Sequence, residues 1–551
     1  MDLRTLNSVF SINISPKKAI LRYQEAGKEA ILEEINGILQ QQVFKGVKRQ
    51  NLTHSQIKKL IRSSMFIKEK WNPIKRIIKL KARLVAGGHM QDRNLYSDSE
   101  RSSPTVAISS FFTLISIAAA GNKKFMNFDF AQAFLNAEMK SDVNMLIDPL
   151  LSKFIIESDN SFAEFLNPDG TICVKLLKAL YGCVESSALW YNHLKNILIK
   201  IGFKVNDYDK CVFTRYSKNG TKTDLCIHVD DGFACSDDLD DLKLLEIQLK
   251  KEFKSVEVNY DNDFEYLGMK IKFDNNGSAE IKMEKYIDRI IQEFGNINFS
   301  AKTPAHNDIF IIDEEAEKLD KSEGEKFHRT VAQLLFLTTR VRPDIMLAVI
   351  FLTSRVREPT TQDLKKLVRI LCYLNGTKEL GLVLGGDINN EIKLFGYADA
   401  AFACHPENMR SHTGLLLSVG RGCVIIKSRS QKSVTTSSAE SELVALSDLT
   451  SMTIHSLNFL KSLNVNLQQA EIFQDNKSTI SMANNGKSNS DRTKHIKIKY
   501  FFIKQYIDSK EVKVTYCPTL NMIADILTKP IQGSQFYYLR DILLGYKHPD
   551  N

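Results

Sequence analysis

A chain of 551 residues with 43% hydrophobic residues is long enough for three or four domains with several cores. It has no apolar run of about 18 residues, and its first residues lead into no signal core, so we expect neither a membrane span nor secretion. Its nine cysteines include no Cys-x-x-Cys pair, which argues against a zinc ribbon or disulfide scaffold and favours a reducing intracellular compartment.

The positive charge is concentrated near the N-terminus. Residues 1–90 contain 18 Lys and Arg against 6 Asp and Glu, a net charge of +12, whereas the whole chain has +9. A basic region of this kind fits a phosphate-rich polymer as partner, and an ordinary solvated surface explains it equally well.

Helical spacing of apolar residues predicts mainly helix over residues 1–60. Apolar and basic residues then alternate over 64–86, which predicts a basic β-hairpin. A helix is expected over 109–120, followed by a short strand over 125–128 that leads into Asp129.

The second half of the chain begins with a polar stretch. Residues 300–325 carry proline and glycine among polar residues and predict a domain boundary. A helical connector is expected over 326–382. A new strand over 392–397 then opens a separate mixed α/β domain.

Asp230 and Asp231 form the most informative pair in the chain. Apolar residues 225–229 predict a strand and residues 232–235 its returning partner, so both acids would lie at the hairpin tip. Adjacent carboxylates repel each other unless a cation lies between them, as divalent ions do in polymerase sites. Taken alone, the pair is more often an ordinary surface turn.

Asp129 adds a third carboxylate at a predicted strand end. Three carboxylates on adjacent strands can hold two divalent ions, one to activate a primer 3′-hydroxyl and one to neutralise pyrophosphate. In the intervening run, Gly182 permits close approach of the backbone to a ligand.

The C-terminal domain carries four separated acids, two expected at strand ends and two on helices: Asp399, Glu442, Asp475 and Asp525. Such a set can bind two metal ions that activate water and stabilise a departing oxygen. Each acid taken alone is more often a surface residue, and Glu440 competes with Glu442 for its position.

These motifs, in order, resemble the reverse transcriptase of copia-type (Pseudoviridae) LTR retrotransposons. The resemblance is carried by residues 81–88, by Asp129 with Ala133-Phe134-Leu135-Asn136, by Ala179-Leu180-Tyr181-Gly182, by Val229-Asp230-Asp231 and by Tyr266-Leu267-Gly268-Met269. The four C-terminal acids are similar to the ribonuclease H tetrad of the same family.

The resemblance implies a role for each matched residue. Asp129, Asp230 and Asp231 would be metal ligands in the polymerase, and Asp399, Glu442, Asp475 and Asp525 in the ribonuclease H, with Glu442 preferred to Glu440. Lys81 and Arg83 would contact the triphosphate, Phe134 would lie under the sugar and exclude a 2′-hydroxyl, and Tyr181 and Gly182 would line the nucleotide pocket. A core aromatic and a solvated charge are the plain alternatives for Phe134 and Arg83.

Four further features complete the comparison with the family. His495 could handle protons or be an ordinary surface histidine, and the basic run through Lys497, Lys499 and Lys504 would suit a hybrid-duplex backbone. His228 replaces a usual Tyr. Residues 185–188, Glu-Ser-Ser-Ala, replace a more usual Lys-Gln-Ser-Pro, which bears on template contact.

We therefore expect an α+β multidomain protein: a basic helical segment (1–60), a right-hand polymerase of fingers, palm and thumb (61–300), a helical connection (301–390) and an RNase H-like α/β domain (391–545). The expected activities are RNA- and DNA-templated DNA synthesis and RNA hydrolysis in hybrids. Each of the two sites would use two Mg²⁺ ions, with Mn²⁺ as an alternative.

The expected partners are RNA and DNA template-primer, RNA–DNA hybrid and dNTPs. Integrase and capsid products of the same polyprotein are further candidates, and no membrane association is expected. The family implies cytoplasmic virus-like particles, with nuclear entry open. The rival hypothesis is an inactive, domesticated nucleic-acid-binding remnant.

Overall fold

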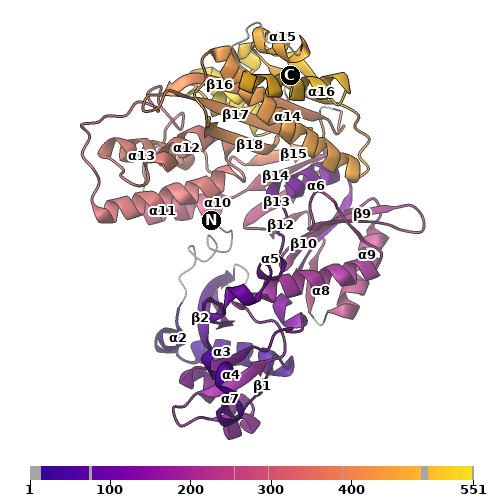
Figure 1. Cartoon of the computed structure of the whole chain (residues 1–551), viewed down its shortest axis with the longest axis vertical. Helices are drawn as coiled ribbons and strands as arrows, with labels where there is room; N and C mark the ends of the chain where they lie inside the picture. Colours follow the sequence, from indigo (N-terminus) through magenta and orange to yellow (C-terminus); the bar gives the residue numbers. More distant parts are fainter. Residues whose placement is uncertain are drawn as a thin grey trace.

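The computed structural model describes residues 14–72, 77–253, 255–295, 297–387, 389–485 and 494–548, with the side chains of 70–79 and 491–497 left aside. Four β-sheets follow one another along an elongated molecule. The N-terminal half lies at one end and the C-terminal domain at the other (Figure 1).

The first sheet has the order β1-β6-β5-β2-β3. The predicted basic hairpin is confirmed, because β2 pairs antiparallel with the whole of β3 from Ser63 onward, after its first two residues have paired with β5. The helical prediction for residues 1–60 is confirmed for α2, α3 and α4 and is wrong at β1, whose backbone pairs with β6. The elements are α2 (Pro16–Tyr23), α3 (Glu25–Gln40), β1 (Phe44–Gly46), α4 (His54–Lys58), β2 (Ile61–Asn72), β3 (Ile77–Ala86), β5 (Asn144–Ile147), α7 (Pro149–Ser158) and β6 (Ile172–Leu176).

The second sheet has the order β11-β4-β10-β9-β8-β7 and is buried on both faces. Phe125 of β4 packs with α6 on one face, while its neighbour Met126 packs with α8 and α9 on the other. The predicted helix and strand before Asp129 are confirmed. The elements are α6 (Ile108–Ala120), β4 (Lys124–Phe130), η4 (Ala133–Asn136), α8 (Ser186–Lys200), β7 (Lys204–Val205), β8 (Val212–Tyr216), β9 (Lys222–His228), β10 (Asp231–Ser236), α9 (Leu239–Glu252) and β11 (Val256–Asn259).

A third sheet, β12-β13-β14-β15, joins the two halves. The helical connector predicted over 326–382 is confirmed and consists of α11, α12 and α13. The return of β15 to pair with β14 after those helices was not predicted. The elements are β12 (Asp263–Tyr266), β13 (Met269–Phe273), β14 (Ser278–Lys282), α10 (Glu284–Phe294), α11 (Lys321–Thr338), α12 (Met346–Arg355), α13 (Thr361–Asn375) and β15 (Leu382–Gly385).

The C-terminal domain is a mixed sheet of order β18-β17-β16-β19-β20 beside α14. The strand predicted at 392–397 is longer than expected, so Asp399 lies inside β16 and not at its end. Its position faces Gly414 of β17, where pairing continues without interruption. The elements are β16 (Leu394–His405), β17 (Arg410–Val419), β18 (Cys423–Ser430), α14 (Ser438–Ser462), β19 (Ala470–Gln474), α15 (Lys477–Asn485), α16 (Lys494–Asp508), β20 (Val512–Tyr516), η8 (Ile523–Leu527) and α17 (Gly533–Leu543).

One hydrophobic core runs through both halves of the molecule. It includes Phe233 of the second sheet, Leu371 of the connector and Leu415 of the C-terminal sheet. Direct polar contacts add to it: the Asn206 side chain donates to the Ser462 hydroxyl over 2.7 Å. The two halves are therefore packed against each other and not merely tethered.

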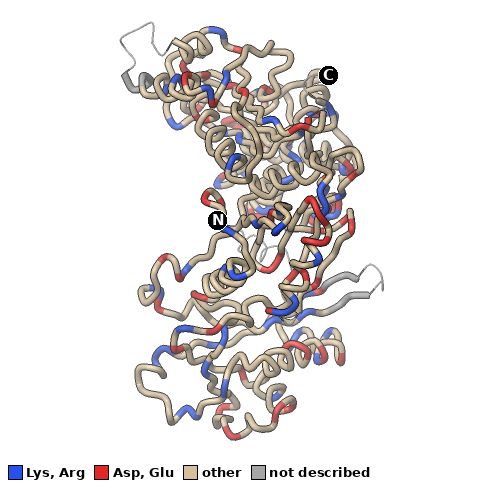
Figure 2. The backbone as a smooth tube through the Cα atoms, turned by 90° about the vertical axis from the view of Figure 1, so that its right-hand side faces the viewer, with Lys and Arg blue, Asp and Glu red and all other residues tan. Residues whose placement is uncertain are grey.

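Acidic and basic residues are interspersed along the chain at both ends of the molecule (Figure 2). Within the described residues, none of the helices combines the length and the apolar character that crossing a membrane requires.

Candidate functional sites

The β9–β10 hairpin brings the three acids of the first site to one edge of the second sheet. Asp231 opens β10 and pairs with Asp129 of β4 on one side and with His228 of β9 on the other. Asp230 lies in the turn, and its carbonyl oxygen accepts the Phe130 N–H over 3.0 Å. The expectation that both adjacent acids lie in the turn is thus wrong for Asp231, because strand pairing begins at that residue.

A buried tryptophan holds the turn of this hairpin. Val229 has a φ of +61°, a value that a β-branched residue rarely adopts. Trp190 of α8 donates its indole N–H to the Val229 carbonyl oxygen over 2.6 Å, and its ring is only 1% exposed. The strained turn therefore persists because surrounding structure fixes it.

The three carboxylates of this edge suit a divalent cation. Asp129 and Asp231 are direct cross-strand neighbours on the adjacent strands β4 and β10. The side chains of Asp129, Asp230 and Asp231 are all half-buried. Opposed, partly desolvated carboxylates favour a hard cation that takes oxygen ligands.

The residues expected around the nucleotide also meet. The Arg83 guanidinium carbon lies 5.0 Å from the centre of the Tyr181 ring, and that ring makes an edge contact with Phe134 at 4.7 Å between centroids. Burial raises the pKa of the Tyr181 hydroxyl, and the charges of Asp230 and Asp129 raise it further. This cluster is therefore close to the acids, with Lys81 exposed at its rim.

Two backbones touch beside this cluster. Gly182 has a φ of +93°, and a Cβ there would lie 2.2 Å from the Ala86 carbonyl oxygen. A Cβ at Gly88 would lie 1.9 Å from the carbonyl oxygen of Gly182. The Ala86 N–H also donates to the Tyr181 carbonyl oxygen over 2.7 Å. Glycine is required at both positions because no side chain fits between the segments.

The unusual residues before α8 do not lie on the surface. Glu185, Ser186 and Ser187 are 2%, 2% and 4% exposed. Glu185 is the N-cap and Ser186 and Ser187 form the first turn of α8, so this departure from the family pattern lies in a buried helix start and not on the surface.

Sequence reasoning missed one acid next to the nucleotide cluster. Glu34 of α3 is 8% exposed and accepts the Leu84 N–H over 3.0 Å. Burial raises the pKa of its carboxyl, while Leu84, Gln132, Arg83 and Lys81 oppose the shift. The sequence did contain a sign of this residue, because Glu34 shares the apolar face of α3 with Ile31, Ile35 and Ile38.

The second site is the most compact group of acids in the described chain. Asp399, Asp475 and Asp525 offer ligand oxygens that all lie within 4.8 Å of one another. They come from the middle of β16, the end of β19 and η8. Three carboxylates so placed suit a divalent cation.

Glu442 lies beside this trio, whereas Glu440 does not serve it. The Gln474 amide donates to Glu442 Oε2 over 3.3 Å, and Asp399 and Asp475 act on the Glu442 charge. Glu440 instead lies in the first turn of α14, where its Oε2 accepts the Thr436 N–H over 2.6 Å and its own N–H donates to the N-cap Ser437. The geometry therefore separates the two glutamates that the sequence left open.

The acids of the second site raise one another's pKa, because they are buried close together. Burial and then Asp399 raise the pKa of Asp525 to about 7, and the same two causes raise the pKa of Asp475. Burial also raises the pKa of Glu442 well above its usual range. Lys529 lies 2.7 Å from Asp525 Oδ1 and 3.3 Å from Asp399 Oδ1 and supplies a single positive charge.

A hydrogen-bonded chain supports η8 from behind. His405 Nε2 lies 3.0 Å from His412 Nδ1, and His412 Nε2 lies 2.7 Å from the Ser428 hydroxyl. Ser428 donates to the Leu527 carbonyl oxygen over 2.8 Å, so His412 Nε2 carries the proton that it donates to Ser428. Burial lowers the pKa of His412 to about 3 and keeps the ring neutral.

The predicted basic run is only partly described. The side chains of His495 and Lys497 lie outside the described residues. Lys499 is half-buried, and Lys504 pairs with Asp508 at 2.8 Å.

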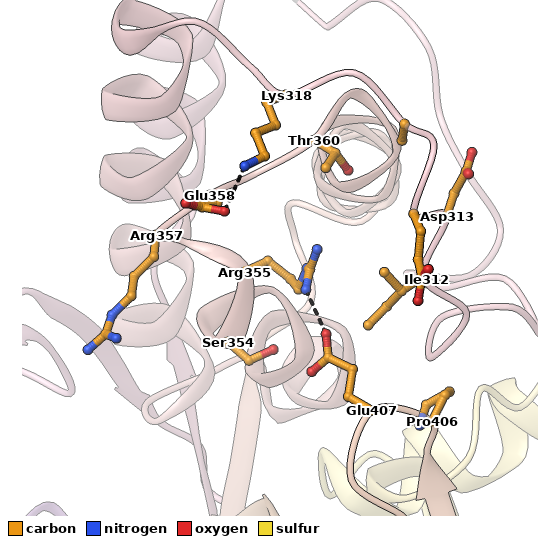
Figure 3. Close-up of a pocket in the computed structure, with 12 residues that line it drawn as sticks. Ile312, Asp313, Lys318, Ser354, Arg355, Arg357, Glu358, Thr360, Pro406 and Glu407 are labelled. Atoms are coloured by element: carbon orange, nitrogen blue, oxygen red, sulfur yellow. Dashed lines mark hydrogen bonds and ion pairs between the residues drawn. The ribbon is translucent and has the colours of Figure 1, made fainter.

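A sizeable cavity among the described residues lies away from both sites. A volume of about 570 Å³ opens between the connector and the tip of the β16–β17 hairpin, lined by charged residues of both signs (Figure 3). Arg355 pairs with Glu407 at 3.1 Å, and Lys318 pairs with Glu358 at 2.9 Å. The Arg355–Glu407 pair joins the connector to the β16–β17 hairpin across this cavity.

The sequence matches known proteins over most of its length. Residues 52–307 match the family "Reverse transcriptase (RNA-dependent DNA polymerase)". Residues 52–307 thus carry the sequence pattern of a reverse transcriptase domain, and most of the chain is similar to the corresponding portion of copia-type retrotransposon Pol polyproteins. The fold itself is mixed α and β and has several sheets.

Two curated relatives illustrate this similarity. The Pol polyprotein of transposon TNT 1-94 from Nicotiana tabacum is 27% identical over 85% of this chain and 34% of its own length. The Ty1-DR5 Gag-Pol polyprotein of Saccharomyces cerevisiae is 26% identical over 96% of this chain and 30% of its own. This reverse transcriptase portion thus spans about a third of these relatives.

Solved structures of a foamy viral protease-reverse transcriptase are also similar. The form in complex with double-stranded DNA has a TM-score of 0.48 and 13% identity, covering 90% of this chain and 70% of that one. The form in complex with an RNA/DNA hybrid has a TM-score of 0.46 and 13% identity, covering 93% and 55%.

Proposed function

We propose that the chain synthesises DNA on RNA and DNA templates at the first site and hydrolyses the RNA strand of hybrids at the second. The substrates are template-primer, dNTPs and RNA–DNA hybrid. Divalent ions, Mg²⁺ or Mn²⁺, supply activation of the attacking oxygen and neutralise the leaving group when bound at each site.

At the first site, Asp129, Asp230 and Asp231 hold the ions at the sheet edge. Arg83 pairs with the triphosphate, and Lys81 at the rim adds a second positive charge. Phe134 and Tyr181 pack under the sugar of the incoming nucleotide, where a bulky ring leaves no room for a 2′-hydroxyl.

At the second site, Asp399, Asp475 and Asp525 hold the ions and Glu442 completes the set. Gln474 orients Glu442, while the chain from His412 through Ser428 supports the segment that carries Asp525. Oriented carboxylates keep the ligand oxygens in place without reorganisation during the reaction.

One observation carries the proposal: Asp129 and Asp231 face each other across β4 and β10 within the region that matches the reverse transcriptase family. A nucleic-acid-binding remnant has no need for opposed carboxylates, which repel each other in the absence of a cation.

The test uses the full chain with a primed RNA template, dNTPs and Mg²⁺. We expect Asp230→Asn to abolish primer extension and leave hybrid cleavage, and Asp399→Asn to do the reverse. Asp207→Asn is the matched control. The Asp207 side chain is 93% exposed and makes only a long ion pair, 3.9 Å, with Lys210.

Each outcome discriminates between the hypotheses. Extension without cleavage in the unmodified chain would remove the second half of the proposal. Neither activity, with salt-sensitive duplex binding retained, would favour the domesticated remnant.

A further inference from the structure

One face of helix α3 packs around the side chain of Gln132, which lies in the loop between β4 and η4. Glu34, Gly37 and Gln41 are three and four residues apart and so share that face. Glu34 hydrogen-bonds the Gln132 amide, and Gln41 donates to its Oε1. A Cβ at Gly37 would lie 2.8 Å from Gln132 Nε2, so the glycine provides the space for this side chain.

Gln132 needs such support because of its backbone. Its φ of +53° and ψ of +41° are left-handed, which few residues other than glycine adopt. Its carbonyl oxygen accepts the Leu135 N–H over 2.9 Å and so begins η4, which carries Phe134. Fixing the Gln132 side chain therefore fixes the turn from which Phe134 projects.

The other end of the same link reaches the strand that carries Arg83. Glu34 Oε1 accepts the Leu84 N–H over 3.0 Å, and β3 is the edge strand of the first sheet. This carboxylate is 8% exposed. One buried side chain thus joins β3, one residue after Arg83, to the turn two residues before Phe134.

We propose that Glu34 is a positioning residue of the nucleotide pocket, which sets the separation between Arg83 and Phe134. The inference rests on the proposed polymerase function. Arg83 contacts the triphosphate and Phe134 the sugar of one nucleotide, so a looser link weakens nucleotide binding and admits a 2′-hydroxyl. A merely structural role would instead lower the melting temperature without changing the selectivity of the folded protein.

The test compares four variants of the full chain by the kcat and KM for a dNTP, by discrimination against the matching rNTP, and by thermal melting. Glu34→Ala removes both hydrogen bonds. Glu34→Gln keeps an oxygen for the Leu84 N–H, and its new N–H can donate to Gln132 Oε1 once the Gln132 and Gln41 amides turn over. Gln132→Ala cuts the link at its far end without leaving the Leu84 N–H unpaired. Glu29→Ala is the control, an exposed glutamate of the same helix.

We expect Glu34→Ala and Gln132→Ala each to raise the dNTP KM and to lower discrimination about tenfold, as loss of one or two hydrogen bonds implies. Glu34→Gln and Glu29→Ala should stay within about twofold of the unmodified chain. The double variant Glu34→Ala/Gln132→Ala should lose no more than the larger single loss, because both cut one link.

Wild-type KM and discrimination in Gln132→Ala, or additive losses in the double variant, would overturn the inference even if Glu34→Ala failed to fold. Absence of primer extension in the unmodified chain would instead overturn the proposed polymerase function on which it rests.

Discussion

Trp190 and Val229 are joined by a hydrogen bond of 2.6 Å from the indole N–H to the carbonyl oxygen that precedes the Asp230-Asp231 pair. Replacing Trp190 by Phe keeps most of the ring and removes this bond. We expect primer extension to fall about tenfold and unfolding free energy to fall by about 1–3 kcal/mol, since a buried acceptor is left unpaired. Hybrid cleavage by the same molecules should not change. Equal loss of both activities would point to general unfolding instead.

Gly182→Ala should damage the nucleotide pocket more than its backbone angle alone explains. The new Cβ would meet the Ala86 carbonyl oxygen at 2.2 Å, whereas Gly220, with a φ of +81°, has nothing within 4 Å. Gly220→Ala therefore measures the strain of a positive φ alone, about 1 kcal/mol. A larger loss of stability and a higher dNTP KM are expected only for Gly182→Ala, by thermal melting and steady-state kinetics. Matching effects in the two variants would refute the close contact.

The buried His412 makes stability depend on pH. Because its pKa is lowered from 6.5 to about 3, the folded chain keeps the ring neutral while the unfolded chain binds a proton below pH 6.5. Stability should therefore fall as the pH drops from about 6.5 towards 3, by about 1.4 kcal/mol per pH unit for one proton.

Denaturant unfolding of the unmodified chain and of His412→Gln between pH 7 and pH 5 measures this contribution. The variant should have the shallower dependence on pH, and His89→Gln, at an exposed histidine, should match the unmodified chain. A dependence that is unchanged in His412→Gln would assign the acid sensitivity to other groups.

Lys529 should limit how much a divalent ion stabilises the second site. The ammonium already contacts Asp525 and Asp399, so Lys529→Met should lower the melting temperature in chelator and increase the rise on adding Mg²⁺. The raised pKa of Asp525, about 7, means that the metal-free chain loses stability as the pH rises from about 4 to 7. The Mg²⁺ effect should accordingly be larger at pH 8 than at pH 5.5, and absent from this site in Asp399→Asn.

Some of the acids could be placed in the fold from the sequence because they follow a short apolar run that predicts a strand. Asp475 after β19 and Asp230 after β9 are of this kind. The position of Asp399 inside β16 was not predictable in the same way, since its extension depends on pairing with Gly414 of another strand.

The supporting residues could not be found from local patterns. Glu34 hydrogen-bonds Leu84 and Gln132, and Ser428 hydrogen-bonds Leu527. These partners are far apart in the sequence, and the periodicity of a helix or strand predicts only contacts within one element. The return of β15 to β14 likewise depends on the packing of the connector helices between them in sequence.

The C-terminal residues also close a sheet that belongs to the other half. The Val383 N–H of β15 donates to the Leu544 carbonyl oxygen over 2.8 Å, and the Gly381 N–H donates to the Tyr546 hydroxyl over 2.9 Å. A fragment ending before residue 391 would expose these donors along an open strand edge, where another copy could add its own strand. The two candidate sites therefore lie in halves that share a sheet edge, and a truncation between them would leave that edge open to aggregation.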